Sequence, residues 1–369
     1  MKSLLQISND QKFNAPLLFF VVVTSQIAVG IQGFQRLIVK DATHDAWISI
    51  LLSFLFSHFI VYVMFKTLEI YSTNDLFGIQ LDLFGKYLGH LINFSYVIYV
   101  SFAFFVVLKN YTEIITTWVF PNLSQVFISG TLLILVIYSF TGGLRVIIGV
   151  CFISVVSTIW MLLLLLFPLE YAHYNHLLPV LSNDLVSILK GAYSMTFTIV
   201  GFEVVNILYP FVKDKNKAQK YVHFGLFFTC FVYVFVMIVT IVYFSNEQLE
   251  KTIWALLTLF SIIKLPFIER IEIIVICFWL IIILPNLCLF SWSAYRGIVR
   301  IKNIKGTTFI WIFTILIFFV SLPVQSRHDI NRINNIFSKI AFYVVFIYPL
   351  FLYIMASTKK ILKKWVKSS

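Results

Sequence analysis

Apolar residues follow one another along this chain in blocks of about twenty, and most charged residues fall in the short stretches between the blocks. A helix rises about 1.5 Å per residue, so a block of this length crosses the roughly 30 Å hydrocarbon core of a bilayer. The pattern predicts ten membrane-spanning helices, over residues 13–35, 46–67, 89–112, 125–141, 146–168, 186–211, 222–244, 271–295, 306–323 and 336–356. Because ten is even, both chain ends are expected on the same side of the membrane.

The composition supports the same interpretation. Of the 369 residues, 60% are hydrophobic and only 12% are charged, and the mean hydropathy is +0.93. About a quarter of the residues in a soluble domain are charged, so this chain lies far outside that range. We therefore predict an all-α, multi-pass membrane protein with a single integral membrane domain over residues 1–369 and no attached soluble domain.

Positive charges exceed negative ones, with a formal net charge of +12. Such a basic chain also suits an anionic partner such as nucleic acid, but the positions of the Lys and Arg residues decide against it. Eighteen of the 28 lie in the chain ends and in the alternate loops of one face, and such residues collect on the cytoplasmic side of membrane proteins. We predict cytoplasmic N- and C-termini, a basic tail over residues 357–369 that rests on anionic lipid headgroups, and no nucleic-acid partner.

The sequence carries no pattern typical of a metal site, a cofactor site or a catalytic centre. Its four cysteines lie inside apolar blocks and form no CxxC. His173 and His176 lie in an outer loop without further ligands nearby, which favours a solvated loop over a metal site. HExxH, GxSxG and paired intramembrane aspartates are missing from the sequence, so we predict no catalytic residues and no enzymatic activity.

The ten predicted spans divide into two sets of five, over residues 13–168 and 186–356. Five is odd, so the second set enters the membrane from the side opposite to the first. This is the arrangement of an inverted repeat, in which the first helix of each half is often interrupted at the middle of the membrane. Helices one and six are therefore expected to be interrupted.

Both of these helices carry a candidate interruption. The first contains "AVGIQGFQR", in which Gly30 and Gly33 flank Gln32, and the sixth contains "TIVGFEVVN", in which Gly201 stands two residues before Glu203. Glycine weakens a helix by about 1 kcal/mol per site, and backbone groups freed by unwinding are tolerated in a membrane where they line a cavity. We predict a ligand cavity between the two interruptions; close helix packing is the other common use of such glycines.

The predicted ligand-binding residues come from four helices. They are Val29, Gly30, Ile31, Gln32 and Gly33 of helix one, Tyr96 and Val100 of helix three, Val200, Gly201, Phe202 and Glu203 of helix six, and Asn286 of helix eight. Helix three passes close to both interrupted helices in such a fold. Two assignments have a structural alternative, namely Tyr96 as a packing residue and Asn286 as a partner of the carbonyl freed by Pro285.

Glu203 is a carboxylic acid near the middle of an apolar helix, where an unpaired charge costs several kcal/mol. Three roles are open for it: binding an amine of the ligand, taking up a coupling proton, or hydrogen-bonding the interrupted helix of its own protein. Arg36 is a distant counter-charge nearer the outer surface. Elsewhere, we expect Lys109 and Glu113, one helical turn apart, to form an ion pair, and His58 to be a hydrogen-bonded packing residue.

Several stretches resemble the endospore germination permeases, a branch of the amino acid–polyamine–organocation transporter superfamily. "GFEVVNILYPFVKDKNKAQKY" is similar to the Gly-x-Glu, Pro and lysine-rich loop of that family, and "DAWI", "PFIERIE" followed by Trp279, and "FVSLP" agree with it in order and spacing. In helix one, Gly30 and Arg36 match the family pattern, whereas Ala28 and Gln35 stand where its first Gly and its Pro fall. The resemblance covers essentially the whole chain.

The resemblance implies a LeuT-like fold and a permease-like B subunit of a spore germinant receptor. Such a subunit binds a small nutrient germinant, for example an amino acid, inside the spore inner membrane or cell membrane. Its implied partners are the A subunit, which is a membrane protein, and the lipoprotein C subunit, and binding triggers germination. An autonomous proton-coupled amino acid transporter of the same fold is the alternative function.

Overall fold

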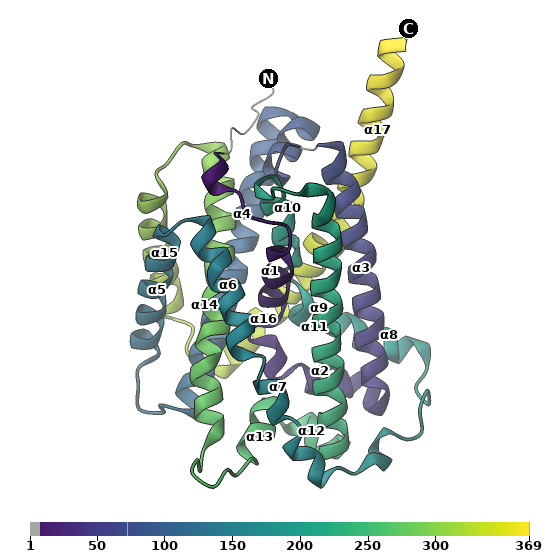
Figure 1. Ribbon diagram of the computed structural model, residues 1–369, viewed down its shortest axis with the longest axis vertical. Helices are drawn as coiled ribbons and strands as arrows, with labels where there is room; N and C mark the ends of the chain where they lie inside the picture. Colours follow the sequence, from purple (N-terminus) through teal and green to yellow (C-terminus); the bar gives the residue numbers. More distant parts are fainter. Residues whose placement is uncertain (1–7, 72, 369) are drawn as a thin grey trace.

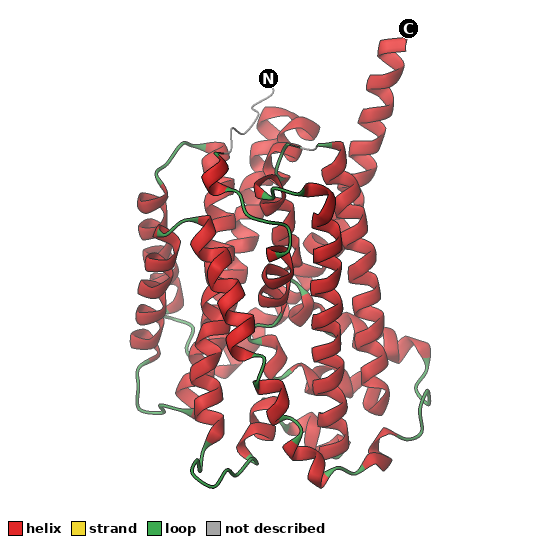
Figure 2. Ribbon diagram, viewed as in Figure 1, coloured by secondary structure: helices red, strands yellow, loops and turns green. Residues whose placement is uncertain are grey.

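The computed structural model describes residues 8–71 and 73–368. Within these ranges all regular structure is helical, and the helices run roughly along one direction as a bundle (Figure 2). Six helical stretches are long and apolar enough to cross a membrane: Phe34–Ile70, Leu76–Trp118, Leu144–Tyr171, Lys215–Tyr243, Ile271–Ile301 and Arg327–Leu362. The prediction of a multi-pass, all-α membrane protein is confirmed.

The remaining predicted spans appear as interrupted or shorter helices. A pair bent by 41°, Leu185–Ser194 with Thr196–Phe211, forms a seventh span when it is counted as one. Three apolar helices of 10 to 17 residues coincide with predicted spans one, four and nine: Leu17–Gln26, Gln125–Thr141 and Gly306–Ser321. The exact number of ten spans stays a prediction, because length and composition alone identify six or seven.

The first half of the chain contains α1 to α7. Their bounds are α1 Leu17–Gln26, α2 Phe34–Ala42, α3 Ala46–Ile70, α4 Leu76–Trp118, α5 Gln125–Thr141, α6 Leu144–Thr158 and α7 Met161–Leu164. The longest of them, α4, begins well before the predicted start at residue 89 and bends at Gly85, where φ is +77°. The first turns of α4 therefore lie outside the straight part that we predicted as span three.

The second half contains α8 to α17. Their bounds are α8 Leu185–Ser194, α9 Thr196–Ile199, α10 Val205–Leu208, α11 Lys215–Tyr243, α12 Asn246–Lys251, α13 Ala255–Ser261, α14 Ile271–Ile301, α15 Gly306–Ser321, α16 Arg327–Ala341 and α17 Tyr348–Ser368. A π-helical turn, Phe342–Ile347, joins the last two helices. The last span thus begins nine residues before the predicted residue 336, because a polar helical stretch precedes the apolar one.

The described part of the chain begins and ends at the same end of the bundle, which we call the terminal face; the opposite end is the distal face (Figure 1). The chain runs from α1 towards α2 at the distal face, whereas it runs from α8 at the distal face towards α10. The two interrupted helices are therefore antiparallel, as an inverted repeat requires. Helix α17 continues beyond the bundle at the terminal face, and the side chains of residues 363–369 lie outside the described part of the predicted basic tail.

Contacts between the chain ends and the loops close the terminal face. The backbone of Phe13 exchanges two hydrogen bonds with the end of the sixth span, from its N–H to Phe211 O and from the N–H of Lys213 to its carbonyl, both 3.0 Å long. The buried carboxylate of Asp75 accepts from Arg296 at 3.1 Å and from Arg300 at 2.8 Å, which joins the start of α4 to α14. The large polar cavity described below lies near the distal face.

Candidate functional site

The first interruption separates α1 from α2. Helix α1 ends at Gln26, a 3-10 turn covers Gly30–Gln32, and α2 begins at Phe34. The backbone leaves the helical region at Ile27, where ψ is 87°, and again at Gly33, where φ is −147°. The predicted interruption of helix one is confirmed, and it occupies the glycine-containing stretch.

The second interruption lies in the sixth span, directly beside the first. After α9, Val200 is extended and Gly201 adopts φ +119°, a left-handed conformation that L side chains rarely adopt. A Cβ atom at Gly201 would lie 2.3 Å from the carbonyl oxygen of Ser25, and one at Gly30 would lie 2.7 Å from Thr198 Oγ1. Glycine is therefore needed at both breaks for close approach, and at Gly201 for the backbone conformation as well.

Side chains of the protein itself bind the backbone groups that the first interruption frees. The amide nitrogen of Asn286 donates to the carbonyls of Thr24 at 3.2 Å and Ser25 at 3.1 Å. The Tyr233 hydroxyl donates to Gln26 O at 3.0 Å, and the Trp279 indole N–H donates to Ala28 O at 3.2 Å. The side chain of Gln26 in turn donates to Ile199 O of the second interruption at 2.6 Å. The two breaks are thus joined by direct hydrogen bonds.

Glu203 serves the interrupted helix of its own protein. One carboxylate oxygen accepts from the Tyr99 hydroxyl at 2.8 Å, and the other accepts from the backbone N–H of Gly201 at 2.6 Å. Its side chain is fully enclosed, with 1% of the residue exposed. Of the three roles left open by the sequence, the geometry provides the third, because this carboxylate holds the left-handed turn at Gly201 to helix α4.

Replacing Asn286 with leucine is expected to lower the stability of the folded protein. The two side chains are similar in size, but leucine leaves the Thr24 and Ser25 carbonyls without their buried donor, at a cost of about 1–3 kcal/mol for each unpaired group. In detergent, the Tm of Asn286→Leu should fall by roughly 5 °C. Asn122→Leu, at an exposed loop position, is the matched control and should leave the Tm unchanged. An unchanged Tm for Asn286→Leu would show that these bonds contribute nothing.

A cavity of about 580 Å³ lies on the distal side of the two interruptions. Its walls come from the first interruption and α2, from α4, from the sixth span, from the segment before α13, and from α16. The lining residues are Val29, Gly30, Gly33, Phe34, Arg36, Leu37, Lys40, Asp41, Asn110, Tyr193, Ser194, Phe197, Ile253, Trp254, Arg327, Asn331, Asn334, Asn335, Ser338 and Lys339. We call this cavity the distal vestibule. Its volume suits a small organic molecule.

The structure brings only part of the predicted binding set to this vestibule. Val29, Gly30 and Gly33 line it, whereas the other nine residues do not. Ile31 instead faces a separate, mostly apolar cavity of about 60 Å³ between α1, α6, α11 and α14. The remaining eight lie in the packed interior: Gln32, Tyr96, Val100, Val200, Gly201, Phe202, Glu203 and Asn286. Tyr96, for example, packs against Phe77 and Tyr99.

One face of α16 forms the largest polar wall of the vestibule, and it was not predicted from the sequence. Six residues of the stretch "RHDINRINNIFSK" line the vestibule: Arg327, Asn331, Asn334, Asn335, Ser338 and Lys339. The sequence contains a signal for this face, because Arg327, Asn331, Asn334 or Asn335, and Ser338 follow one another at intervals of three or four and mark one side of an amphipathic helix. It was overlooked because the tenth span was predicted to begin only at residue 336.

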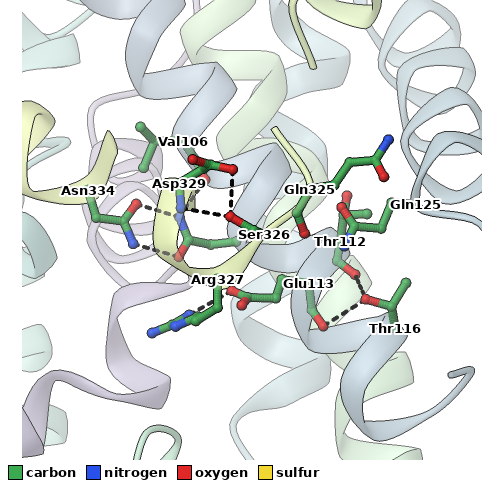
Figure 3. Close-up of polar contacts among 11 residues, drawn as sticks. Val106, Thr112, Glu113, Thr116, Gln125, Gln325, Ser326, Arg327, Asp329 and Asn334 are labelled. Carbon is green, nitrogen blue, oxygen red and sulfur yellow. Dashed lines mark hydrogen bonds and ion pairs between the residues drawn. The ribbon is translucent and has the colours of Figure 1, made fainter. Parts of the chain in front are cut away.

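Two polar contacts fasten this face of α16 to α4 (Figure 3). The Arg327 guanidinium binds the Glu113 carboxylate at 2.6 Å, and the side-chain amides of Asn110 and Asn334 exchange two hydrogen bonds of 2.8 and 2.9 Å. The expected Lys109–Glu113 ion pair is therefore wrong, since Lys109 donates to the side chain of Gln125 at 3.0 Å. Glu113 pairs with Arg327 because the packing of α16 against α4 brings the Arg327 guanidinium within hydrogen-bonding distance of it.

Two further predictions about histidines can be compared with the structure. Nδ1 of His58 on α3 lies 2.7 Å from Nδ1 of His223 on α11, so His58 is a hydrogen-bonded packing residue, as predicted. His173 and His176 lie in the distal loop, and His176 contacts the Ile241 carbonyl at 3.3 Å. Within residues 8–71 and 73–368, no group of three or more His, Cys, Asp or Glu side chains is arranged to hold a metal ion.

The sequence resembles known spore germination proteins along most of its length. The family described as "Spore germination protein" matches residues 12–330. Spore germination protein GerQB of Bacillus cereus is 33% identical over 354 residues, which covers 96% of this chain and 98% of that protein. Spore germination protein YndE of Bacillus subtilis is 23% identical over 92% of this chain and 95% of its own length. Spore germination protein B2 of the same species is 20% identical over 95% of this chain and 97% of its own length.

Two solved structures with a similar fold are those of MhsT and of a manganese transporter. MhsT in complex with L-phenylalanine superposes with a TM-score of 0.61 over 92% of this chain and 87% of that chain, at 12% identity. A manganese transporter of Eremococcus coleocola superposes with a TM-score of 0.59 over 91% of this chain and 78% of that chain, at 10% identity. At this level of identity the likeness concerns the fold alone, and it confirms the LeuT-like arrangement expected from the two interrupted helices.

Proposed function

Since this chain belongs to the spore germination permease family, we propose that it is the permease-like B subunit of a spore germinant receptor. The distal vestibule is the observation that carries the proposal. It is large enough for a small nutrient molecule, and it reaches the first interruption, where Val29, Gly30 and Gly33 form part of its wall. A receptor subunit of this kind recognises the germinant inside the membrane domain.

The backbone at the first interruption offers a polar contact to such a ligand. Val29 lines the vestibule, and among the described residues its N–H donates no hydrogen bond. Buried N–H groups are normally paired, so a ligand oxygen is a suitable partner for this one. The other side of the vestibule supplies the amides of α16, and a germinant between them contacts both an interrupted helix and the last span.

Binding between these elements provides a physical route to signalling. A ligand shifts a conformational equilibrium only by its differential affinity for the two states. A germinant that contacts both α2 and α16 stabilises the conformation in which the distance between these two helices matches the size of the germinant. We propose that this bias passes to the other receptor subunits and leads to release of ions and other spore contents.

The proposal includes the location and the partners of the chain. The positive-inside pattern of the loops supports cytoplasmic termini, so the distal vestibule opens on the outer side of the spore inner membrane, where a germinant arrives. We propose that the chain assembles there with the A subunit and with the lipoprotein C subunit. These subunits contact its lipid-facing sides, and α17 and the loops of the terminal face lie in the cytoplasm.

Filling the vestibule tests the function. In spores that depend on this chain, Asn331→Trp places a large ring in the vestibule and should reduce the germination response at least about tenfold. Ile336→Trp on the same helix is the matched control, because Ile336 is 45% exposed on the outside of the bundle and does not line the vestibule. Equal responses from the two variants would contradict binding there. Proton-driven amino acid uptake into vesicles by this chain alone would instead support an autonomous transporter.

A further inference from the structure

Cationic side chains dominate the charged lining of the distal vestibule. Arg36 and Lys40 of α2 and Arg327 and Lys339 of α16 line it, against a single lining carboxylate, Asp41. That carboxylate lies 3.4 Å from the hydroxyl of Ser194. A cleft lined by one sign of charge concentrates ligands of the opposite sign. The distal vestibule therefore favours anions over neutral molecules and cations.

The two arginines of this group differ in their bonding. Arg327 is engaged, since it binds Glu113 at 2.6 Å and its guanidinium lies 5.2 Å from the centre of the Trp254 ring. Arg36 is partly buried, and no hydrogen-bond or ion-pair partner is found for it among the described residues. Arg327, whose charge has the same sign, lines the same vestibule. Within residues 8–71 and 73–368, no carboxylate forms an ion pair with Arg36.

From this arrangement we propose that Arg36 is a specificity-determining residue that binds the carboxylate of a small organic ligand in the distal vestibule. The proposal rests on the proposed function and narrows it to one ligand class, molecules that carry a carboxylate. An arginine is well suited to the task, because its planar group donates two parallel hydrogen bonds to the two carboxylate oxygens. Arg327, held by Glu113, adds a second positive charge to the same region.

The rest of the vestibule accommodates the remainder of such a ligand. The aromatic rings of Phe34, Phe197 and Trp254 supply apolar wall. The uncharged side-chain amides of Asn331 and Asn335 supply both hydrogen-bond donors and hydrogen-bond acceptors for other polar groups of the ligand. A carboxylate at Arg36 thus leaves apolar and polar surface within reach for the part of the molecule that distinguishes one carboxylate from another.

Fluorescence quenching of the purified protein tests the charge of the vestibule and does not require the germinant to be identified. Trp254 lines the vestibule, and its signal is isolated as the difference from Trp254→Phe. Iodide should quench it about threefold less in Arg36→Gln than in the unchanged protein, while quenching by neutral acrylamide stays the same. Arg36→Lys should restore iodide quenching because it keeps the charge. Lys264→Gln, which removes an exposed cation outside the vestibule, is the matched control and should have no effect.

Competition then identifies the ligand chemistry. L-amino acids and short-chain carboxylic acids are tested one by one, each beside its own primary amide. We expect some of the acids to reduce iodide quenching of Trp254. The matching amides should not do so, and the protection should be at least about tenfold weaker in Arg36→Lys, which lacks the planar fork. Equal protection by acids and amides would overturn the proposal. It would also be overturned if only inorganic anions such as chloride protect, or if Arg36→Gln leaves iodide quenching unchanged.

These measurements separate the proposal from the function on which it rests. Quenching and competition use the purified chain and report the chemistry of the vestibule, whereas the response of spores carrying Asn331→Trp reports its role in germination. Suppose that spores carrying Asn331→Trp lose their response, but acids and amides protect Trp254 equally from iodide. The receptor function would then stand, and the proposal that Arg36 binds a carboxylate would be rejected. Carboxylate protection combined with a normal response from Asn331→Trp would reject the receptor function of the vestibule instead.

Discussion

Gly201→Ala is expected to prevent most of the protein from reaching a stable native state. The residue adopts φ +119°, and a Cβ atom there would lie 2.3 Å from the carbonyl oxygen of Ser25 and 2.8 Å from its carbonyl carbon. Both atoms belong to the backbone of the other interrupted helix, so no side-chain movement relieves the overlap. Clash and backbone strain together place the loss of stability above about 4 kcal/mol. In detergent, the Tm should fall by roughly 10 °C or more.

Gly149→Ala provides the comparison for this prediction. Gly149 lies within α6, and a Cβ atom there meets nothing within 4 Å. Alanine is the better helix former by about 1 kcal/mol, so this variant should keep its Tm or raise it slightly. If Gly201→Ala kept its Tm within about 2 °C of the unchanged protein, the close approach of the two interruptions would not be a property of the native fold.

The second large effect is expected at Glu203. Glu203→Leu removes both acceptors and leaves the Tyr99 hydroxyl and the Gly201 N–H buried without a partner, at a cost of about 1–3 kcal/mol each. Glu203→Gln keeps one carbonyl oxygen and should lose about half as much. The expected order of Tm values is unchanged protein, then Glu203→Gln, then Glu203→Leu, measured by thermal unfolding in detergent.

A double substitution shows whether this loss comes from the hydrogen bonds. Tyr99→Phe removes the hydroxyl that Glu203→Leu leaves unpaired, so the pair should destabilise the protein by about 1 kcal/mol less than the sum of the single variants. The prediction fails if Glu203→Leu keeps its Tm but abolishes the germination response. That result would assign the acid to the ligand or to a proton rather than to the interrupted helix.

The sequence alone identified the membrane class, the places of both interruptions and the family. These features are one-dimensional: apolar blocks reveal spans, and Gly30, Gly33 and Gly201 mark where a helix is weak, whatever surrounds them. The same local reasoning predicted that Glu203 needs a special environment. It left three roles open because the partner of Glu203 lies far away in the chain.

Only the tertiary structure revealed the hydrogen-bond partners of Glu203 and located the vestibule. Tyr99 binds Glu203 across 104 residues of sequence, and Asn334 binds Asn110 across 224. Such contacts depend on the rotation and depth of each helix in the bundle, which hydropathy does not record. For the same reason, Glu203 was predicted to face a cavity that instead lies on the distal side of the breaks, against α16. Periodicity locates a polar face, but packing determines which element it meets.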